Sequence, residues 1–211
     1  MMQTHDTLAS LRAQLRQWRR EGASVGFVPT MGHLHAGHAA LLARARQECG
    51  TTLLSIFVNP TQFDDPTDLE RYPRTLEADL AIARSAGIDH VLLPTTAELY
   101  PDAYTYKVQE SAVSTVLCGA SRPGHFDGVC TVVSRLFNQV QPDVAAFGKK
   151  DYQQLAVIRQ LVTDLAFPIQ ILAGSIVRES DGLAMSSRNQ YLSADERPRA
   201  AAIRRTLIAM R

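Results

Sequence analysis

The chain has 211 residues, of which 45% are hydrophobic and 20% charged, so it is long enough to bury one substantial core. Its 22 lysines and arginines nearly balance its 21 acidic residues, and neither sign gathers into a long block. That balance argues against nucleic acid or an anionic membrane surface as a partner. No apolar run approaches the length of a membrane span, and the three cysteines, Cys49, Cys118 and Cys130, lack a CxxC spacing. We therefore expect a cytoplasmic protein with reduced thiols.

The first two elements are a helix and a buried strand. Residues 7–20 predict an amphipathic helix, because their large apolar side chains recur at helical spacing: Leu8, Leu11, Leu15 and Trp18. Residues 25–28 form a short apolar run that is typical of a buried strand. The helix is expected to pack on the body of the protein.

A turn with two glycines and a pair of histidines follows this strand and precedes a helical segment. Gly32 and Gly37 remove side chains that would keep a ligand away from the backbone. His35 and His38 lie three residues apart where the helix begins, so both can point toward one spot. A strand, a glycine turn and a helix start form an anion site, which makes a phosphate-bearing ligand the first hypothesis.

Two other interpretations of this turn remain open. A His-x-Gly-His match can be a short turn whose histidines only bond to backbone carbonyls. The three imidazoles of His33, His35 and His38 could also bind zinc, although no cysteine or carboxylate lies nearby in the sequence to complete such a site.

The rest of the chain alternates between strand and helix patterns. In chain order the expected elements are a strand at 52–58, a helix at 75–86, a strand at 90–94, a helix at 127–138, a strand at 144–147, a helix at 151–166 and a strand at 169–177. This alternation predicts an α/β protein with an open, doubly wound, Rossmann-like parallel sheet.

The sequence changes character after residue 177. It becomes polar through residues 178–189 and ends in a helix that starts near residue 194. We expect residues 1–177 to form the Rossmann-like domain and 178–211 to begin a smaller carboxyl-terminal domain. Because no later element covers the apolar face of the last helix, that second domain is expected to be truncated.

The segments after the predicted strands carry polar side chains suited to a ligand. Open α/β sheets bind ligands outside the carboxyl ends of their strands. Asn59 and Gln62 follow the second of these strands, Lys150 and Gln154 follow a later one, and Arg188 follows the last. The sequence therefore predicts that these side chains converge on one pocket.

Five motifs in this order closely resemble the pantothenate synthetase family, also called pantoate:beta-alanine ligases. They are PTMGHLHAGH at 29–38, FVNPTQF at 57–63, YPRT at 72–75, FGKKDYQQL at 147–155 and DGLAMSSRN at 181–189. The His-x-Gly-His element alone indicates only the nucleotidylyltransferase superfamily. Lys149 departs from the family pattern, since many members carry an acidic residue there, and most of the family's carboxyl-terminal domain is missing.

The resemblance implies an ATP- and Mg²⁺-dependent ligase of pantothenate biosynthesis. ATP and (R)-pantoate would give pantoyl adenylate and pyrophosphate, and beta-alanine would then attack the acyl carbon and release AMP. A carboxylate that attacks a polyphosphate needs positive charge to offset the repulsion. The resemblance also implies a homodimer.

The resemblance carries roles over to matching positions. Catalysis falls to His35, His38, Lys150 and Arg188. The ATP site comprises Met31, Gly32, His33, Leu34, His35, Ala36, Gly37, His38, Gly148, Lys149, Lys150, Asp151, Val177, Met185, Ser186, Ser187 and Arg188. Gln62, Gln154 and Asn59 would bind pantoate, because an amide can donate to a carboxylate and accept from a hydroxyl. Asp79 would help to hold Mg²⁺, or would be a solvated helix carboxylate.

Two further function classes stay open. One is a transferase that moves a nucleotide onto a phosphorylated small molecule, and the other is a non-catalytic module that binds a nucleotide or zinc. Gln62 and Gln154 favour the ligase over the transferase, since a phosphorylated acceptor would call for arginine or lysine at those strand ends.

Overall fold

The computed structural model describes residues 2–210 and contains one sheet of six parallel strands. In spatial order the sheet runs β1-β4-β3-β2-β5-β6. The strands are β1 (Gln3–His5), β2 (Val25–Thr30), β3 (Thr51–Ile56), β4 (His90–Leu92), β5 (Val144–Gly148) and β6 (Gln170–Gly174). The doubly wound α/β fold expected from the alternating pattern is confirmed.

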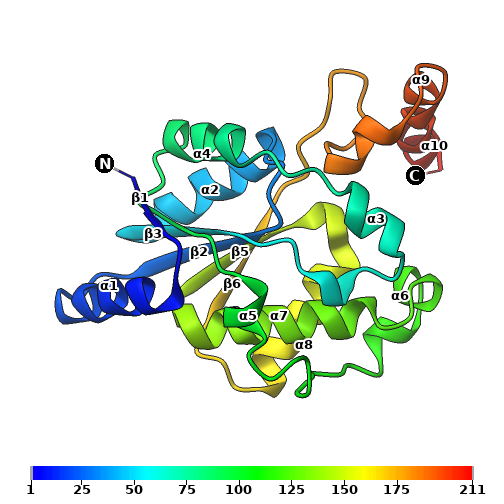
Figure 1. The fold of residues 1–211 in the computed structure, drawn as a ribbon. Helices are drawn as coiled ribbons and strands as arrows, with labels where there is room; N and C mark the ends of the chain where they lie inside the picture. Colours follow the sequence, from blue (N-terminus) through cyan, green and yellow to red (C-terminus); the bar gives the residue numbers. More distant parts are fainter. Residues whose placement is uncertain (1, 211) are drawn as a thin grey trace.

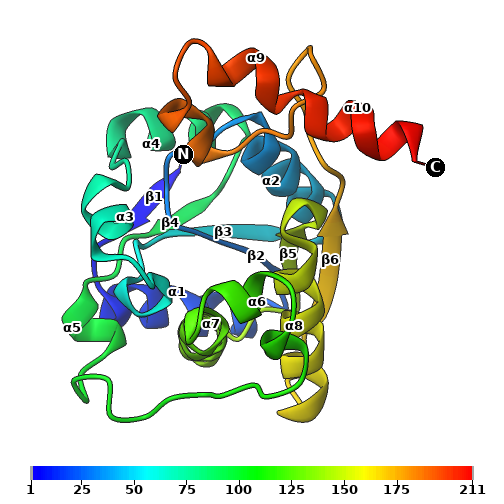
Figure 2. The ribbon, with the colours of Figure 1, turned by 90° about the vertical axis from the view of Figure 1, so that its right-hand side faces the viewer.

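Helices cover both faces of the sheet (Figures 1 and 2). One face carries α2 (Ala36–Glu48) and α4 (Leu76–Ser85), and the other carries α1 (Leu8–Arg20), α7 (His125–Val140) and α8 (Tyr152–Asp164). The shorter helices are α3 (Pro66–Arg71), α5 (Thr96–Leu99), α6 (Cys118–Ser121), α9 (Glu196–Ala200) and α10 (Ala202–Ala209). The central strands are buried on both faces, as in β3, where the four residues 52–55 are all buried.

The core has two parts, one on each side of the sheet. The larger part joins α1, α7 and α8 to the sheet and includes all four apolar residues predicted for the first helix: Leu8, Leu11, Leu15 and Trp18. The smaller part lies under α2 and α4 around Leu42, Leu54 and Val91. Packing on both sides fixes the carboxyl edge of the sheet, where the polar segments begin.

Strand β1 was not predicted, because only one of its three residues is buried. His5 packs against His90 of β4, with His5 Nε2 at 3.1 Å from His90 Nδ1, while Gln3 and Thr4 are exposed. Such a short edge strand has no periodic signal of its own, and it forms through parallel pairing with β4.

The segment after β6 turns back across the molecule. An antiparallel bridge joins Arg178 to Ala184, a 3₁₀ turn covers Ser187–Tyr191, and α9 and α10 follow (Figure 2). The Tyr191 hydroxyl donates to the Arg71 carbonyl at 3.1 Å, which ties this segment to α3. The apolar side chains of α10 are largely exposed: Ile203, Leu207 and Ile208.

No helix within residues 2–210 is long and apolar enough to cross a membrane.

Candidate active site

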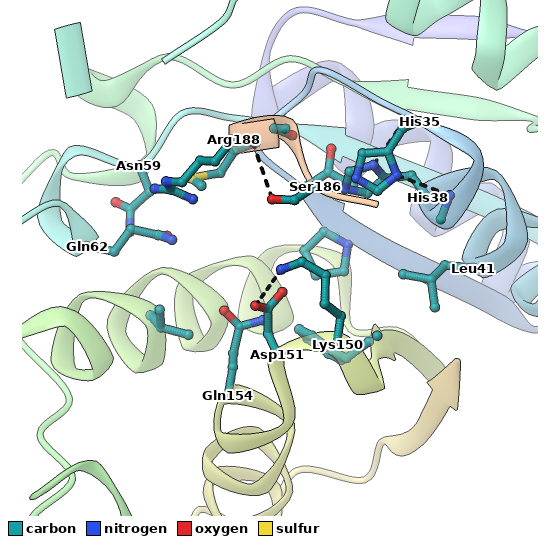
Figure 3. Close-up of a pocket in the computed structure, with 18 of the residues that line it drawn as sticks. His35, His38, Leu41, Asn59, Gln62, Lys150, Asp151, Gln154, Ser186 and Arg188 are labelled. Carbon is teal, nitrogen blue, oxygen red and sulfur yellow. Dashed lines mark hydrogen bonds and ion pairs between the residues drawn. The ribbon is translucent and has the colours of Figure 1, made fainter. Parts of the chain in front are cut away.

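The main cavity lies beyond the carboxyl ends of β2 and β5, where the strand order reverses. From β2 the chain moves outward to β3 in one direction, whereas β5 and β6 lie in the other, so β2 and β5 flank the switch point. The loops after these strands diverge to opposite faces of the sheet and leave a crevice between them. Figure 3 shows the side chains that line it.

The two histidines of the glycine turn cap helix α2. The His35 side chain accepts the Gly37 N–H at its Nδ1 (3.1 Å), and the His38 side chain accepts the His35 N–H at its Nδ1 (3.2 Å). Because each Nδ1 accepts a hydrogen bond, the proton of each neutral ring is on Nε2. Both rings therefore have a free Nε2–H donor beside the start of a helix, and both line the cavity.

Burial, together with the adjacent His35, lowers the pKa of His38 to about 3. Burial and the nearby Lys150 ammonium likewise lower the pKa of His35. The ring centroids of the pair are only 4.1 Å apart, so two positive charges there would repel. The site thus presents neutral imidazole donors near pH 7.

The positive charge of the cavity comes from three cations, each paired with a carboxylate. Lys150 Nζ lies 2.9 Å from Asp151 Oδ1, and Arg188 Nη2 lies 2.6 Å from Asp68 Oδ2. Arg122 Nη2 lies 2.6 Å from Asp64 Oδ1. A polyphosphate that enters the cavity would compete with these carboxylates for the same donors.

Amide side chains form the wall opposite the histidines (Figure 3). Gln62 projects from the 3₁₀ turn after β3, and Gln154 projects from the first turn of α8. Asn59 also lines the cavity but is only 1% exposed, and its Nδ2 donates to Gln62 Oε1 at 3.0 Å. Asn59 therefore supports the neighbouring amide.

The floor of the cavity between these two walls is apolar. It is formed by the side chains of Phe57, Phe63, Tyr72, Val129, Val132, Val133 and Leu136. Four of these residues come from the buried face of α7. An apolar floor with a few fixed polar groups suits a small branched organic acid.

Most of the predicted site residues meet in this cavity. His38, Lys150, Gln62 and Gln154 all line it, as do the remaining predicted members Met31, His35, Gly37, Asn59, Gly148, Asp151, Val177, Met185, Ser186, Ser187 and Arg188. The predicted convergence of the strand ends is therefore observed, although the chemical roles assigned to these residues stay predictions.

Several predicted nucleotide contacts do not line the cavity: Gly32, His33, Leu34, Ala36 and Lys149. The Leu34 side chain is buried in the core under α2, and the Lys149 side chain is exposed beside the cavity. The glycine at position 32 is explained by the backbone and not by a ligand: its φ is +83°, and a Cβ there would lie 2.9 Å from Asp79 Oδ2.

The structure also places Asp79 differently from the prediction of a Mg²⁺ helper. Asp79 is 1% exposed and is absent from the cavity wall. Its Oδ2 accepts the His33 N–H at 3.0 Å, and its Oδ1 accepts the Leu34 N–H at 2.7 Å. The carboxylate therefore anchors the turn before α2, and neither a ligand role nor a solvated helix position fits this geometry.

The sequence analysis gave no role to several residues that the structure brings into the cavity, among them Tyr72, Arg122 and His125. His125 Nδ1 donates to the Gln62 carbonyl at 2.7 Å, while its Nε2 faces Arg122 at 3.3 Å. Burial lowers the pKa of His125. His125 lies two residues before the helix predicted at 127–138, and its contact with Gln62 spans 63 residues, so no local signal pointed to it.

Metal-ligating side chains do not cluster in the part of the chain that the structure describes. No group of three or more histidine, cysteine or acidic side chains converges within residues 2–210. His33, the third histidine of the zinc alternative, turns toward Thr75, whose Oγ1 lies 3.5 Å from its Nδ1. Asp151 is the one carboxylate found on the cavity wall among these residues.

A switch-point crevice with neutral histidine donors at a helix start and cations around it is typical of nucleotide-binding α/β enzymes with a His-x-Gly-His motif. The pantoate-beta-alanine ligase family model matches residues 3–211, and this chain belongs to that family.

The relatives extend beyond the length of this chain. A pantothenate synthetase of Xanthomonas campestris pv. campestris (strain B100) is 62% identical over 213 aligned residues, which cover 100% of this chain and 75% of that protein. A pantothenate synthetase structure from Thermus thermophilus matches with a TM-score of 0.93 and 50% identity, over 99% of this chain and 74% of that one.

A third comparison concerns a ligand complex. The structure of a pantoate-beta-alanine ligase from Francisella tularensis, complexed with beta-gamma ATP and beta-alanine, matches with a TM-score of 0.92 and 36% identity. The match covers 96% of this chain and 78% of that one.

Proposed function

We propose that this chain condenses (R)-pantoate with beta-alanine in two steps, with ATP as the source of activation. The pantoate carboxylate attacks the α-phosphorus of ATP, and pyrophosphate leaves. The amine of beta-alanine then attacks the acyl carbon of the pantoyl adenylate, loses a proton and displaces AMP. The observation that carries the proposal is the single cavity that joins phosphate-binding donors to an amide wall.

The phosphates of ATP are assigned to the histidine side of the cavity. The Nε2–H groups of His35 and His38 would donate to phosphate oxygens, and Lys150 and Arg188 would offset the charge that develops on the leaving pyrophosphate. The position of Ser186 and Ser187 on the cavity wall supports a role in holding phosphate oxygens. The backbone around Met31, Gly148 and Val177 would contact the adenosine.

Pantoate is assigned to the amide side. Gln62 and Gln154 offer hydrogen-bond partners for a carboxylate and for hydroxyl groups, and the apolar residues of α7 suit the two methyl groups of pantoate. An acid without the hydroxyl groups would leave these amides unpaired, which lowers its binding.

A Mg²⁺ ion fits the chemistry of the cavity through Asp151. Protein sites commonly hold Mg²⁺ with one or two carboxylates and the substrate phosphates, and Asp151 is a carboxylate on the wall beside Lys150. When bound, the ion would supply additional positive charge to the polyphosphate. Asp79 is not proposed for this role, because backbone N–H groups occupy its oxygens.

We also propose the two-domain division, with residues 1–177 as the nucleotide-binding domain and 178–211 as the start of a covering domain. The antiparallel bridge between Arg178 and Ala184, outside the main sheet, supports a boundary there. An acyl adenylate needs protection from water, which a covering domain provides. Limited proteolysis tests this boundary: we expect the first cleavage to fall after β6.

A homodimer in the cytoplasm completes the proposal. The homodimer rests on the family resemblance, and sedimentation measures it directly. The cytoplasmic location rests on the three cysteines, which are free thiols in the structure, and cell fractionation tests it.

The deciding experiment is to incubate the protein with ATP, Mg²⁺ and pantoate and to examine the enzyme-bound fraction by mass spectrometry. A bound pantoyl adenylate, followed by AMP release on addition of beta-alanine, supports the ligase. Pyrophosphate release with AMP retained in a product made from a phosphorylated acceptor would instead assign the transferase activity.

A further inference from the structure

The amide group of Asn59 has a hydrogen-bond partner for each of its bonding positions. Its Oδ1 accepts from the Tyr100 hydroxyl at 2.7 Å and from the Thr61 hydroxyl at 3.0 Å. Its Nδ2 donates to the Gly128 carbonyl at 3.2 Å and to Gln62 Oε1 at 3.0 Å. A buried amide with four partners cannot rotate without breaking several bonds at once.

The backbone carbonyl of Gly128 identifies which end of the Asn59 amide is its NH₂ group. A carbonyl can only accept, so the part of Asn59 that faces Gly128 must be its NH₂ group. The second hydrogen of that NH₂ group then points at Gln62, whose contacting atom must be its oxygen. The NH₂ group of Gln62 is the end that remains for the cavity. The backbone of Gly128 packs closely against the turn that carries Gln62, since a Cβ on Gly128 would lie 2.2 Å from the Thr61 carbonyl oxygen.

Tyr100 closes this network from outside the cavity. Its side chain is 4% exposed and is not part of the cavity wall. The Arg135 guanidinium lies 4.8 Å from the centre of its ring and is itself held by an ion pair with Asp102 (2.8 Å). Arg135 Nη1 also donates to the Leu99 carbonyl at 2.7 Å. The ring that carries the hydroxyl therefore packs against a guanidinium group that is itself fixed by two polar contacts.

We infer that Tyr100 is a positioning residue for the acid substrate: through Asn59 it holds Gln62 with the amide NH₂ toward the cavity. A site that presents N–H donors favours a substrate with carboxylate and hydroxyl oxygens over one that presents donors of its own. The inference rests on the proposed function, because it takes Gln62 as a contact of pantoate.

The first test is the variant Tyr100→Phe, which keeps the ring and removes the hydroxyl. Loss of one hydrogen bond to a neutral amide predicts a rise in the KM for pantoate of roughly threefold to tenfold, with the KM for ATP unchanged. Tyr104→Phe is the matched control, because its ring lies 4.7 Å from that of Tyr100 and its hydroxyl is outside the network. An unchanged pantoate KM in Tyr100→Phe, or equal rises in both KM values, overturns the inference.

A double-mutant cycle separates positioning from general stability. If Tyr100 acts through Gln62, Tyr100→Phe has no further effect on the pantoate KM in a Gln62→Ala background. Independent effects that multiply contradict the inference.

The variant Asn59→Asp supplies a second route should Tyr100→Phe fold poorly. An aspartate has no NH₂ group to give to Gln62, so Gln62 would turn its oxygen to the cavity. Pantoate KM is then expected to rise more than in Tyr100→Phe, with ATP KM retained. A pantoate KM like that of the wild type overturns the inference.

Failure of the proposed function gives a different result. In that case the wild-type protein itself forms no pantoyl adenylate. If only the positioning inference fails, the wild-type protein is active and Tyr100→Phe has the same KM for pantoate as the wild type.

Discussion

The two walls of the cavity are built in different ways. The histidine wall relies on local contacts: His35 and His38 bond to backbone groups within three residues of themselves. The amide wall relies on distant contacts, because Asn59 reaches Tyr100 and Gly128, which are 41 and 69 residues away. One short segment is thus enough to orient the histidine donors, whereas several distant segments are needed to orient the amides.

The largest effect is expected at the histidine wall, from Lys150→Ala. Removal of a well-placed cation that stabilises the leaving pyrophosphate should lower the rate of adenylate formation about 100- to 1,000-fold. Lys149→Ala is the control, since Lys149 does not line the cavity. Pyrophosphate release measures both rates, and equal losses in the two variants would contradict the assignment.

Asp79→Ala tests whether the histidine wall also depends on a contact with a residue that is distant in the sequence. It leaves the N–H groups of His33 and Leu34 without their acceptor, which should lower the free energy of unfolding by about 3 kcal/mol. Urea denaturation measures this change, and exposed Glu77→Ala in the same helix is the control. A variant with full stability that only requires more Mg²⁺ would restore the metal-ligand hypothesis.

Gly128→Ala disturbs the amide wall alone. The added Cβ would lie 2.2 Å from the Thr61 carbonyl oxygen, so the turn that carries Gln62 must shift. We expect a loss of about 2 kcal/mol in stability and a raised KM for pantoate with little change for ATP. Gly50→Ala, where the nearest atom to a Cβ is 3.9 Å away, is the control. Parallel changes in the two KM values would show that the walls are not separable.

The smallest effect concerns pH. Because the pKa of His38 lies at about 3, below the usual 6.5, its ring stays neutral in the folded protein from pH 8 to pH 5 and keeps its Nε2–H donor. ¹⁵N NMR of the imidazole should show one neutral tautomer throughout, with His38→Gln used for assignment. A His38 signal that titrates near pH 6.5 would refute the buried, neutral arrangement.

The same shift has a consequence for stability. The unfolded chain binds a proton at His38 below pH 6.5 and the folded chain does not. The contribution of His38 to stability is therefore fully present above pH 6.5 and declines as the pH falls from 6.5 toward 3.

Local patterns predicted most of the fold. The apolar spacing of residues 7–20 and the mostly apolar segment 52–58 predicted α1 and β3 to within one or two residues at their boundaries. Strand β1 was missed because its place depends on β4, 85 residues further along. A three-residue edge strand has too few buried side chains to produce a period.

The candidate site, like the fold, was predicted from the sequence only in part. The motifs predicted that His38, Lys150, Gln62 and Gln154 would converge, because parallel strands end at a common edge. They did not predict that Asp79 would anchor the turn or that His125 would hold Gln62, since a residue type does not reveal which distant backbone group it meets.

The sequence by itself determined the alternation of strands and helices from β2 onward, the family and the histidine pair at the start of α2, because each depends on neighbouring residues. Only the tertiary structure decided which end of Gln62 faces the cavity and that Asp79 is buried outside the cavity wall. The physical reason is that a buried polar group must find partners, and the identity of those partners is set by packing between segments that are far apart in the chain.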